Sequence, residues 1–321
     1  MTPQSGHIQV NGATLYHETC GKPENPPLLL VSAGNGTSVF LEPLASALSR
    51  DFFVMTFDRR GFYRSMVESS ESLSGDILTK NAEDCACIIE KLSSKRPAFV
   101  FASSGSATIA LELLRIKPHL IVRAVLHEPI LTAMLSPSDR LGLMELLDKA
   151  TRVYKKSGST AANRLLIPAL SSPADISSLK SAPVLKQLAA LPPNPVDVYF
   201  EYEMEAISHY PFDLQDLLPP KDQLCLARGD VASSTLAISP VARLSSVLNC
   251  SLEIFPGGHH GSMPTLPLPE ISDDVMATAL GMRPLLLSSK GTLNRPSMKS
   301  LVDENVSSRM SRLEALQAPW I

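Results

Sequence analysis

The stretch PAFVFASSGSATIAL, residues Pro97–Leu111, decides how the fold is interpreted. The apolar run Phe99–Ala102 follows a proline and precedes small residues, which is typical of a buried strand. The apolar residues after Ser106 predict the start of a buried helix. The strand would then pass into the helix through a tight turn centred on Ser104. Such a turn needs small residues around its centre, because a larger Cβ would meet the neighbouring backbone. Ser104 is therefore either a candidate nucleophile or the N-cap of the helix.

Strands and helices alternate on both sides of this stretch. A hairpin is expected around Asn11-Gly12, a dipeptide that favours a two-residue turn. The predicted strands are His7–Val10, Ala13–Glu18, Leu28–Val31, Phe52–Phe57, Phe99–Ala102, Ile121–Leu126, Gln223–Ala227 and Ser251–Phe255. The predicted helices between them include Phe40–Leu48, Asp76–Leu92 and Ser239–Leu248, and a final helix, Ile271–Leu280, follows the last strand. This alternation predicts an α/β fold whose central sheet is mostly parallel and has helices on both faces.

The alternation stops between about residues 130 and 218, where the segments have helical spacing and proline-rich joints separate some of them. These segments are Leu141–Tyr154, Ala161–Leu170, Pro183–Leu191 and Val196–Ser208. We interpret residues 130–218 as a helical cap inserted into a core made of residues 1–129 and 219–283. Residues 284–321 form a C-terminal extension with only a weak helical pattern, and its role is left open.

Composition excludes several classes of protein. A hydrophobic content of 44% and a net charge of −3 provide no basic surface for nucleic acid, and no apolar stretch is long enough to cross a membrane. The first residues lack the basic start and apolar segment of a secretory signal. Five cysteines without a CxxC pair indicate reduced thiols. We expect a cytoplasmic protein whose partner is a small-molecule substrate, with a homodimer as one option for assembly.

Four loops follow the ends of predicted parallel strands, where this class of sheet places its sites. In chain order they are LLLVSAGNG (28–36), FDRRGFYRS (57–65), ASSGS (102–106) and FPGGHHG (255–261). Across roughly residues 7–282 these motifs and their order resemble the α/β-hydrolase superfamily, of the serine hydrolase type. Ala102 and Ser106 depart from the family pattern, which has glycine at both positions of the nucleophile elbow. The chain is similar to microbial and fungal members associated with secondary metabolism.

The resemblance implies roles for particular residues. Ser104 is the expected nucleophile, and a histidine must lie within hydrogen-bond reach because a serine hydroxyl is weakly nucleophilic by itself. His259 matches the family position directly after the glycines, with His260 as the competitor. The backbone N–H of Gly105 is expected to form the oxyanion hole together with that of Gly34 or Asn35.

The acid that orients the histidine has two candidates. Many family members carry it after the seventh strand, where the usual spacing falls on Ala232 and the nearest acid is Asp230. Others take it from the end of the sixth strand, where this chain has Glu128. A carboxylate that ends an apolar strand is costly to bury without a partner. We favour Glu128, and a salt bridge from Glu128 to the cap is the structural alternative.

Other charged residues have structural interpretations. Asp58, Arg59 and Arg60 are expected to hold the loops beside the site rather than to act in it. Glu201, Glu203 and Glu205 are expected to form a solvated face of a cap helix or to pair the cap with the core. Tyr202, His209 and Tyr210 are candidates for the pocket lining. No metal-ligand spacing or phosphate-binding loop is present in the sequence, so no metal or cofactor is expected.

The predicted function is cofactor-independent hydrolysis of an ester, thioester or lactone of a small organic compound through an acyl-enzyme. Two alternatives stay open. The same residues could serve lyase, cyclisation or C–C cleavage chemistry in a biosynthetic pathway, since a fold does not fix a reaction. The protein could also be a catalytically silent member that binds a ligand, as the missing elbow glycines suggest.

Overall fold

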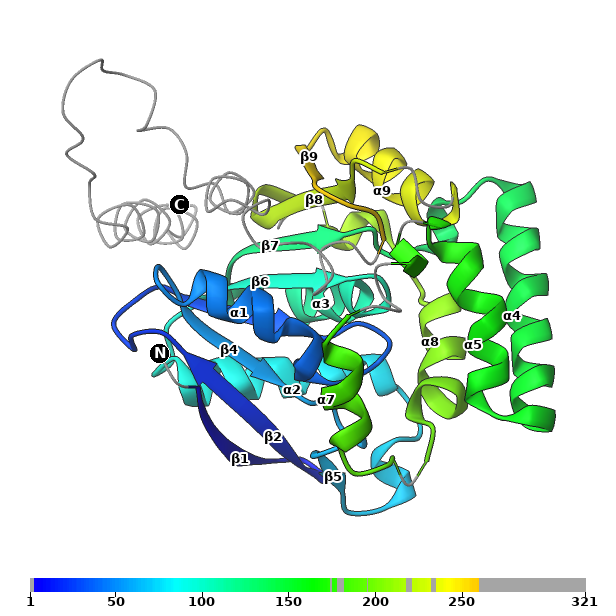
Figure 1. Cartoon of the computed structure of the whole chain (residues 1–321). Helices are drawn as coiled ribbons and strands as arrows, with labels where there is room; N and C mark the ends of the chain where they lie inside the picture. The colour runs from blue at the N-terminus through cyan, green and yellow to red at the C-terminus, as the bar shows by residue number, and fades with distance from the viewer. Residues whose placement is uncertain are drawn as a thin grey trace.

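The computed structural model describes residues 3–173, 175–177, 182–194, 196–217, 221–231 and 235–259. Within them, strands β1–β9 form one sheet in the order β1-β2-β4-β3-β6-β7-β8-β9, with β5 paired to β2 (Figure 1). The strands are β1 Gln4–Val10, β2 Ala13–Cys20, β3 Pro27–Val31, β4 Phe53–Phe57, β5 Met66–Val67, β6 Ala98–Ser103, β7 Ile121–His127, β8 Leu224–Gly229 and β9 Leu252–Phe255.

The sheet is antiparallel at one end and parallel elsewhere. Strands β1 and β2 form the predicted hairpin, with Gly12 in the left-handed region at φ 73°, and β2 runs antiparallel to β4. From β4 through β3, β6, β7 and β8 to β9 every pairing is parallel. All residues of β3, β4 and β6 are buried, as expected for strands covered on both faces. The predicted fold class is confirmed.

Helices cover both faces of the sheet. They are α1 Glu42–Leu48, α2 Ile77–Leu92, α3 Gly105–Ile116, α4 Pro137–Ser157, α5 Ser159–Leu170, α7 Val184–Ala190, α8 Met204–Ser208 and α9 Thr235–Leu248. Apolar residues of α2, α3 and α9 pack with one face of the sheet in the larger core, and those of α1 pack with the other face. The side chain of Asp76 caps α2 by accepting a hydrogen bond from the N–H of Thr79 at 3.1 Å.

Helices α4, α5, α7 and α8 lie between β7 and β8 in the chain, in the interval predicted as a cap. Figure 1 shows α4 and α5 side by side at the outside, with α8 between them and the sheet. The helix predicted over Val196–Ser208 begins instead as a π-helical turn, Tyr199–Glu203, and continues as α8. We call Tyr199–Glu203 the π-turn. That the inserted segment forms a separate cap domain stays a prediction.

Some expectations fall on parts of the chain that the structure does not describe. The helix predicted over Ile271–Leu280, the extension 284–321 and His260 lie outside the described residues. Strand β5, which comes after the FDRRGFYRS loop, was not anticipated from sequence. Among the described helices, none combines the length and apolar character needed to span a membrane.

Candidate active site

Ser104 occupies the sharp turn between β6 and α3. Its backbone has φ 59° and ψ −130°, a left-handed conformation that costs a non-glycine residue on the order of 1–3 kcal/mol. The N–H of Ser104 donates to the carbonyl of His127 at 2.9 Å, which holds the turn against the end of β7. Ser104 is only partly buried, whereas the residues on either side of it are buried.

The two elbow positions that lack glycine are accommodated by local contacts. Ala102 is fully buried in β6. The Ser106 hydroxyl lies 3.1 Å from the carbonyl of Val31 and 2.8 Å from that of Ser103, and it accepts a hydrogen bond from the N–H of Ser103. Its small side chain therefore adds polar contacts between β3 and β6 without opening the turn. The departures from the family pattern leave the geometry of the elbow intact.

His259 reaches Ser104 from the far end of the described chain. It follows β9 and a Pro-Gly-Gly turn in which Gly257 has φ 92°. Its Nε2 lies 2.9 Å from the Oγ of Ser104, and its ring is completely buried. The hydroxyl donates to Nε2 when the ring proton is on Nδ1, so the imidazole is in position to accept the serine proton.

Glu128 follows β7 and is fully buried with φ 44°. Its Oε2 lies 2.8 Å from Nδ1 of His259, and its Oε1 accepts from the N–H of Gly229 at 2.9 Å. Burial by itself would raise the pKa of Glu128, but the hydrogen bond from His259, the nearby charges and the Gly229 N–H together lower it to about 2. The group is therefore a carboxylate, which keeps the histidine proton on Nδ1.

Asp230, the other acid considered from sequence, has a different place. Its side chain is exposed, and its Oδ1 accepts a hydrogen bond from the N–H of Gly257 at 2.8 Å. Asp230 therefore supports the turn that carries His259 instead of contacting the imidazole in this arrangement. The backbones pack closely here, because a Cβ added to Gly229 would lie 2.1 Å from the carbonyl oxygen of Gly257.

Comparisons with known proteins agree with this architecture. A family model described as the alpha/beta hydrolase fold matches residues 26–179. The uncharacterized hydrolase YraK of Bacillus subtilis (strain 168) is 27% identical over 266 residues, which are 81% of this chain and 91% of that protein. The chain has the α/β-hydrolase fold.

Solved structures show the same fold at lower identity. A hydrolase from Pseudomonas aeruginosa PA01 superimposes with a TM-score of 0.66 at 19% identity, covering 86% of this chain and 98% of its own. A carboxylesterase from Bacillus subtilis superimposes with a TM-score of 0.59 at 16% identity, covering 88% of this chain and 93% of its own.

The candidate oxyanion loop lies between β3 and α1. A turn closed by the N–H of Gly36 and the carbonyl of Ala33, 2.9 Å apart, presents Gly34 and Asn35 at its tip. The buried carboxylate of Asp58 accepts from the hydroxyl of Thr37 at 2.9 Å and from the N–H of Ser38 at 2.8 Å. Asp58 also binds Arg64, from Nε to Oδ2 at 2.7 Å. These contacts fit the structural role expected for Asp58.

Two side chains of the inserted segment border the loops around Ser104, and neither was expected there from the sequence. A Cβ on Gly105 would lie 2.8 Å from Cδ1 of Ile207, and one on Gly34 would lie 3.1 Å from Cε2 of Tyr199. Ile207 and Tyr199 therefore lie directly over the two glycines expected to supply oxyanion donors. The expected pocket residues Tyr202 and Tyr210 pack against the larger core, and Tyr210 also donates to Glu112 at 3.1 Å.

His127 lies beneath the elbow, and its burial predicts that the protein becomes less stable at acidic pH. Its ring is fully buried, and its Nδ1 lies 3.0 Å from the Oγ of Ser103. Burial lowers the pKa of His127 from 6.5 to about 4. Between pH 6.5 and 4, His127 therefore binds a proton in the unfolded chain but not in the native state. The native state has its full stability with respect to this group above pH 6.5 and loses stability as the pH falls toward 4.

We expect the free energy of unfolding to fall by on the order of 2–3 kcal/mol between pH 7.5 and 4.5 because of His127. Glu128 adds little in this window, because its stabilisation is lost only below its unfolded value of 4.5. Urea titrations at both pH values would measure the change. His127→Asn, which keeps a polar atom near Ser103, should be less stable at pH 7.5 but lose less on acidification. An equal loss in both proteins would contradict the assignment.

Proposed function

We propose that this protein is a serine hydrolase that cleaves a carboxylic ester, thioester or lactone of a small organic compound through an acyl-enzyme. The observation that carries the proposal is the chain of contacts from Ser104 through His259 to Glu128, with distances of 2.9 and 2.8 Å. Such a chain is the arrangement that activates a serine hydroxyl at neutral pH. YraK and the two solved relatives, all named as hydrolases or esterases, support hydrolysis in general.

Acylation is the first half of the proposed reaction. Oγ of Ser104 attacks the substrate carbonyl carbon while its proton passes to Nε2 of His259. The N–H groups of Gly105 and of Gly34 or Asn35 stabilise the oxygen that becomes negative. Gly105 is suited to this role because it is the first residue of α3, whose leading N–H groups have no partner within the helix. The alcohol or thiol leaves with the proton from His259.

Deacylation repeats these steps with water. A water molecule attacks the acyl carbonyl and gives a proton to His259, and the proton returns to Oγ of Ser104 as the carboxylic acid departs. The buried carboxylate of Glu128 stabilises the imidazolium that forms in both halves. Every group that the steps require belongs to this chain, the substrate or water. Tyr199 and Ile207 would contact the acyl compound, which favours a substrate with an apolar portion.

A fluorophosphonate probe tests this proposal, because it reacts covalently with an activated serine. We expect the wild-type protein to become labelled at Ser104, as read by fluorescence after electrophoresis and by intact mass. The Ser104→Ala variant should show no labelling while unfolding at a temperature similar to the wild type. A wild-type protein that does not react, or a Ser104→Ala variant that reacts as fast as the wild type, would exclude Ser104 as the nucleophile.

A further inference from the structure

The candidate oxyanion loop accepts two hydrogen bonds from Arg59. The Nη2 of Arg59 donates to the carbonyl oxygen of Ala33 at 2.8 Å, and the N–H of Arg59 donates to the carbonyl of Gly36 at 2.8 Å. Arg59 is almost completely buried. A side chain and its backbone thus contact both ends of the turn whose tip is Gly34 and Asn35.

The contact with Ala33 determines where Gly34 points its N–H. The carbonyl of Ala33 and the N–H of Gly34 belong to the same peptide group, and no peptide bond in the described residues is cis. In a planar trans peptide these two bonds point in opposite directions. The carbonyl accepts from two donors, Arg59 and the N–H of Gly36 that closes the turn, and the Arg59 side chain is the one of them that comes from outside the loop. By holding the carbonyl, Arg59 helps to fix the direction of the N–H that is expected to stabilise the oxyanion.

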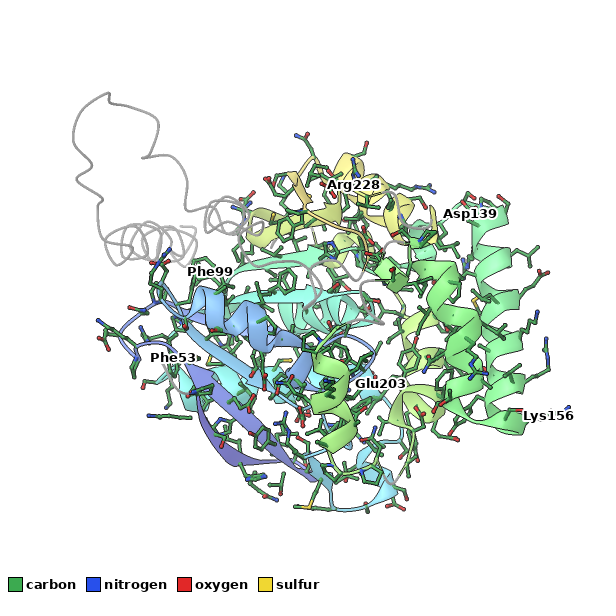
Figure 2. All side chains as sticks on the ribbon, in the orientation of Figure 1. Phe53, Phe99, Asp139, Lys156, Glu203 and Arg228 are labelled. Carbon is green, nitrogen blue, oxygen red and sulfur yellow. The ribbon has the colours of Figure 1, made fainter. Side chains whose placement is uncertain are left out.

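Arg59 is in turn held by Glu203, from the inserted segment. Glu203, labelled in Figure 2, is fully buried at the end of the π-turn. Its Oε1 accepts from Nη1 of Arg59 and, at 3.3 Å, from Nδ2 of Asn81. The first residue of the same turn, Tyr199, lies over Gly34. The π-turn therefore reaches the loop twice, once through Tyr199 and once through the Glu203–Arg59 pair.

The neighbouring pair Arg60–Asp84 has a geometry that Arg59–Glu203 lacks. Arg60 binds Asp84 through two parallel hydrogen bonds of 2.7 Å, the geometry that makes a buried pair strong. Arg59 instead divides its two terminal nitrogens between a carboxylate and the Ala33 carbonyl. Its Nε and the Oε2 of Glu203 are buried without a protein partner among the described residues. Burying charges in this way is costly.

We propose that Arg59 and Glu203 are positioning residues that aim the N–H of Gly34 at the substrate oxyanion, so that the π-turn sets the geometry of the oxyanion hole. This inference rests on the proposed serine hydrolase function. It extends the pairing of inserted segment and core considered from sequence, because it gives that pairing an effect on the reaction. Neither residue touches the substrate, and both act through the peptide between Ala33 and Gly34.

The test is the double variant Arg59→Met/Glu203→Leu, compared with the matched control Arg60→Met/Asp84→Leu. Replacing both members of a buried pair with apolar residues is often neutral for stability, whereas removing one leaves a buried charge. The control removes a pair of similar burial, one residue away, that does not contact the oxyanion loop. Three quantities are measured: the melting temperature, the second-order rate of fluorophosphonate labelling, and kcat and KM for a p-nitrophenyl ester.

We expect Arg59→Met/Glu203→Leu to keep its melting temperature and KM but to lose roughly ten- to a hundredfold in labelling rate and kcat, since one oxyanion donor contributes about a hundredfold or more. The control should keep the wild-type rate. If the double variant does not fold, Arg59→Lys replaces it, because one ammonium keeps the charge facing Glu203 but cannot hold both acceptors.

Wild-type labelling in a folded Arg59→Met/Glu203→Leu variant, or in Arg59→Lys where it replaces that variant, would overturn the inference and leave the proposed function standing. An equal loss in the Arg60→Met/Asp84→Leu control would also overturn it, because the effect would then belong to any buried pair. A wild-type protein that is not labelled at all would instead refute the proposed function itself. These results are therefore distinguishable.

Discussion

Replacing His259 with alanine should lower kcat for an ester substrate by about 10⁶-fold, because the variant has no base to accept the proton of Ser104. The ring is completely buried between Ser104 and Glu128, so bulk water cannot readily take its place. The double variant Ser104→Ala/His259→Ala should be no slower than either single variant, since the two groups act as a unit. Stopped-flow and steady-state kinetics of p-nitrophenyl ester hydrolysis would measure the losses in kcat.

His260→Ala is the matched control for this prediction, since it removes the adjacent histidine that the sequence leaves as a competitor. We expect this variant to keep kcat within a few-fold of the wild type. Thermal unfolding of both variants would show that the fold is retained. Loss of activity in His260→Ala with retention in His259→Ala would reverse the assignment of the base.

The succession of all strands except β5 along the chain, and the place of the elbow, could be predicted because they depend on local patterns. Short apolar runs end in loops of small or polar residues, and parallel strands bring the carboxyl ends of those runs together. A serine between small residues at the end of such a strand has two main interpretations, a nucleophile or the N-cap of the next helix. The sequence could not show that the hydroxyl of Ser106 would bond across to the carbonyl of Val31, a contact that glycine could not make.

Pairings between distant residues were harder to predict. Glu203 lies in a helical pattern with two other glutamates, and nothing in the sequence separates it from its neighbours. In the structure Glu203 is fully buried against Arg59, 144 positions away, while Glu201 accepts from the phenol of Tyr154 at an exposed site. The sequence also did not predict that the expected helix begins as a π-turn. An extra residue in a helical turn is set by tertiary contacts more than by local propensity.

The choice between Glu128 and Asp230 shows where spacing rules reach their limit. Both residues follow strands that end beside the site, and the family uses either position. The two carboxylates are separated by their contacts: Glu128 meets the imidazole, whereas Asp230 accepts from the backbone of Gly257. Spacing alone does not reveal which way each side chain turns. The positive φ of Glu128, at 44°, is a backbone feature that sequence did not suggest.

Glu128→Gln should lower kcat by about 10⁴-fold with little change in the fold. Glutamine has nearly the shape of glutamate, but its amide can donate to Nδ1 and so favours the tautomer whose Nε2 carries the proton. That tautomer cannot accept the proton of Ser104. Because the pKa of Glu128 is about 2, the wild-type group is a carboxylate at every pH used for assay.

Asp230→Asn is the matched control for Glu128→Gln, since it makes the same change of carboxylate to amide. Its effect should be less than about tenfold, because an amide oxygen can still accept from the N–H of Gly257. Rates of ester hydrolysis and of fluorophosphonate labelling, measured on both variants, test the assignment. A folded Glu128→Gln variant with wild-type turnover, beside an inactive Asp230→Asn variant, would give the orienting role to Asp230. The contact at 2.8 Å between Glu128 and His259 would then be a structural one.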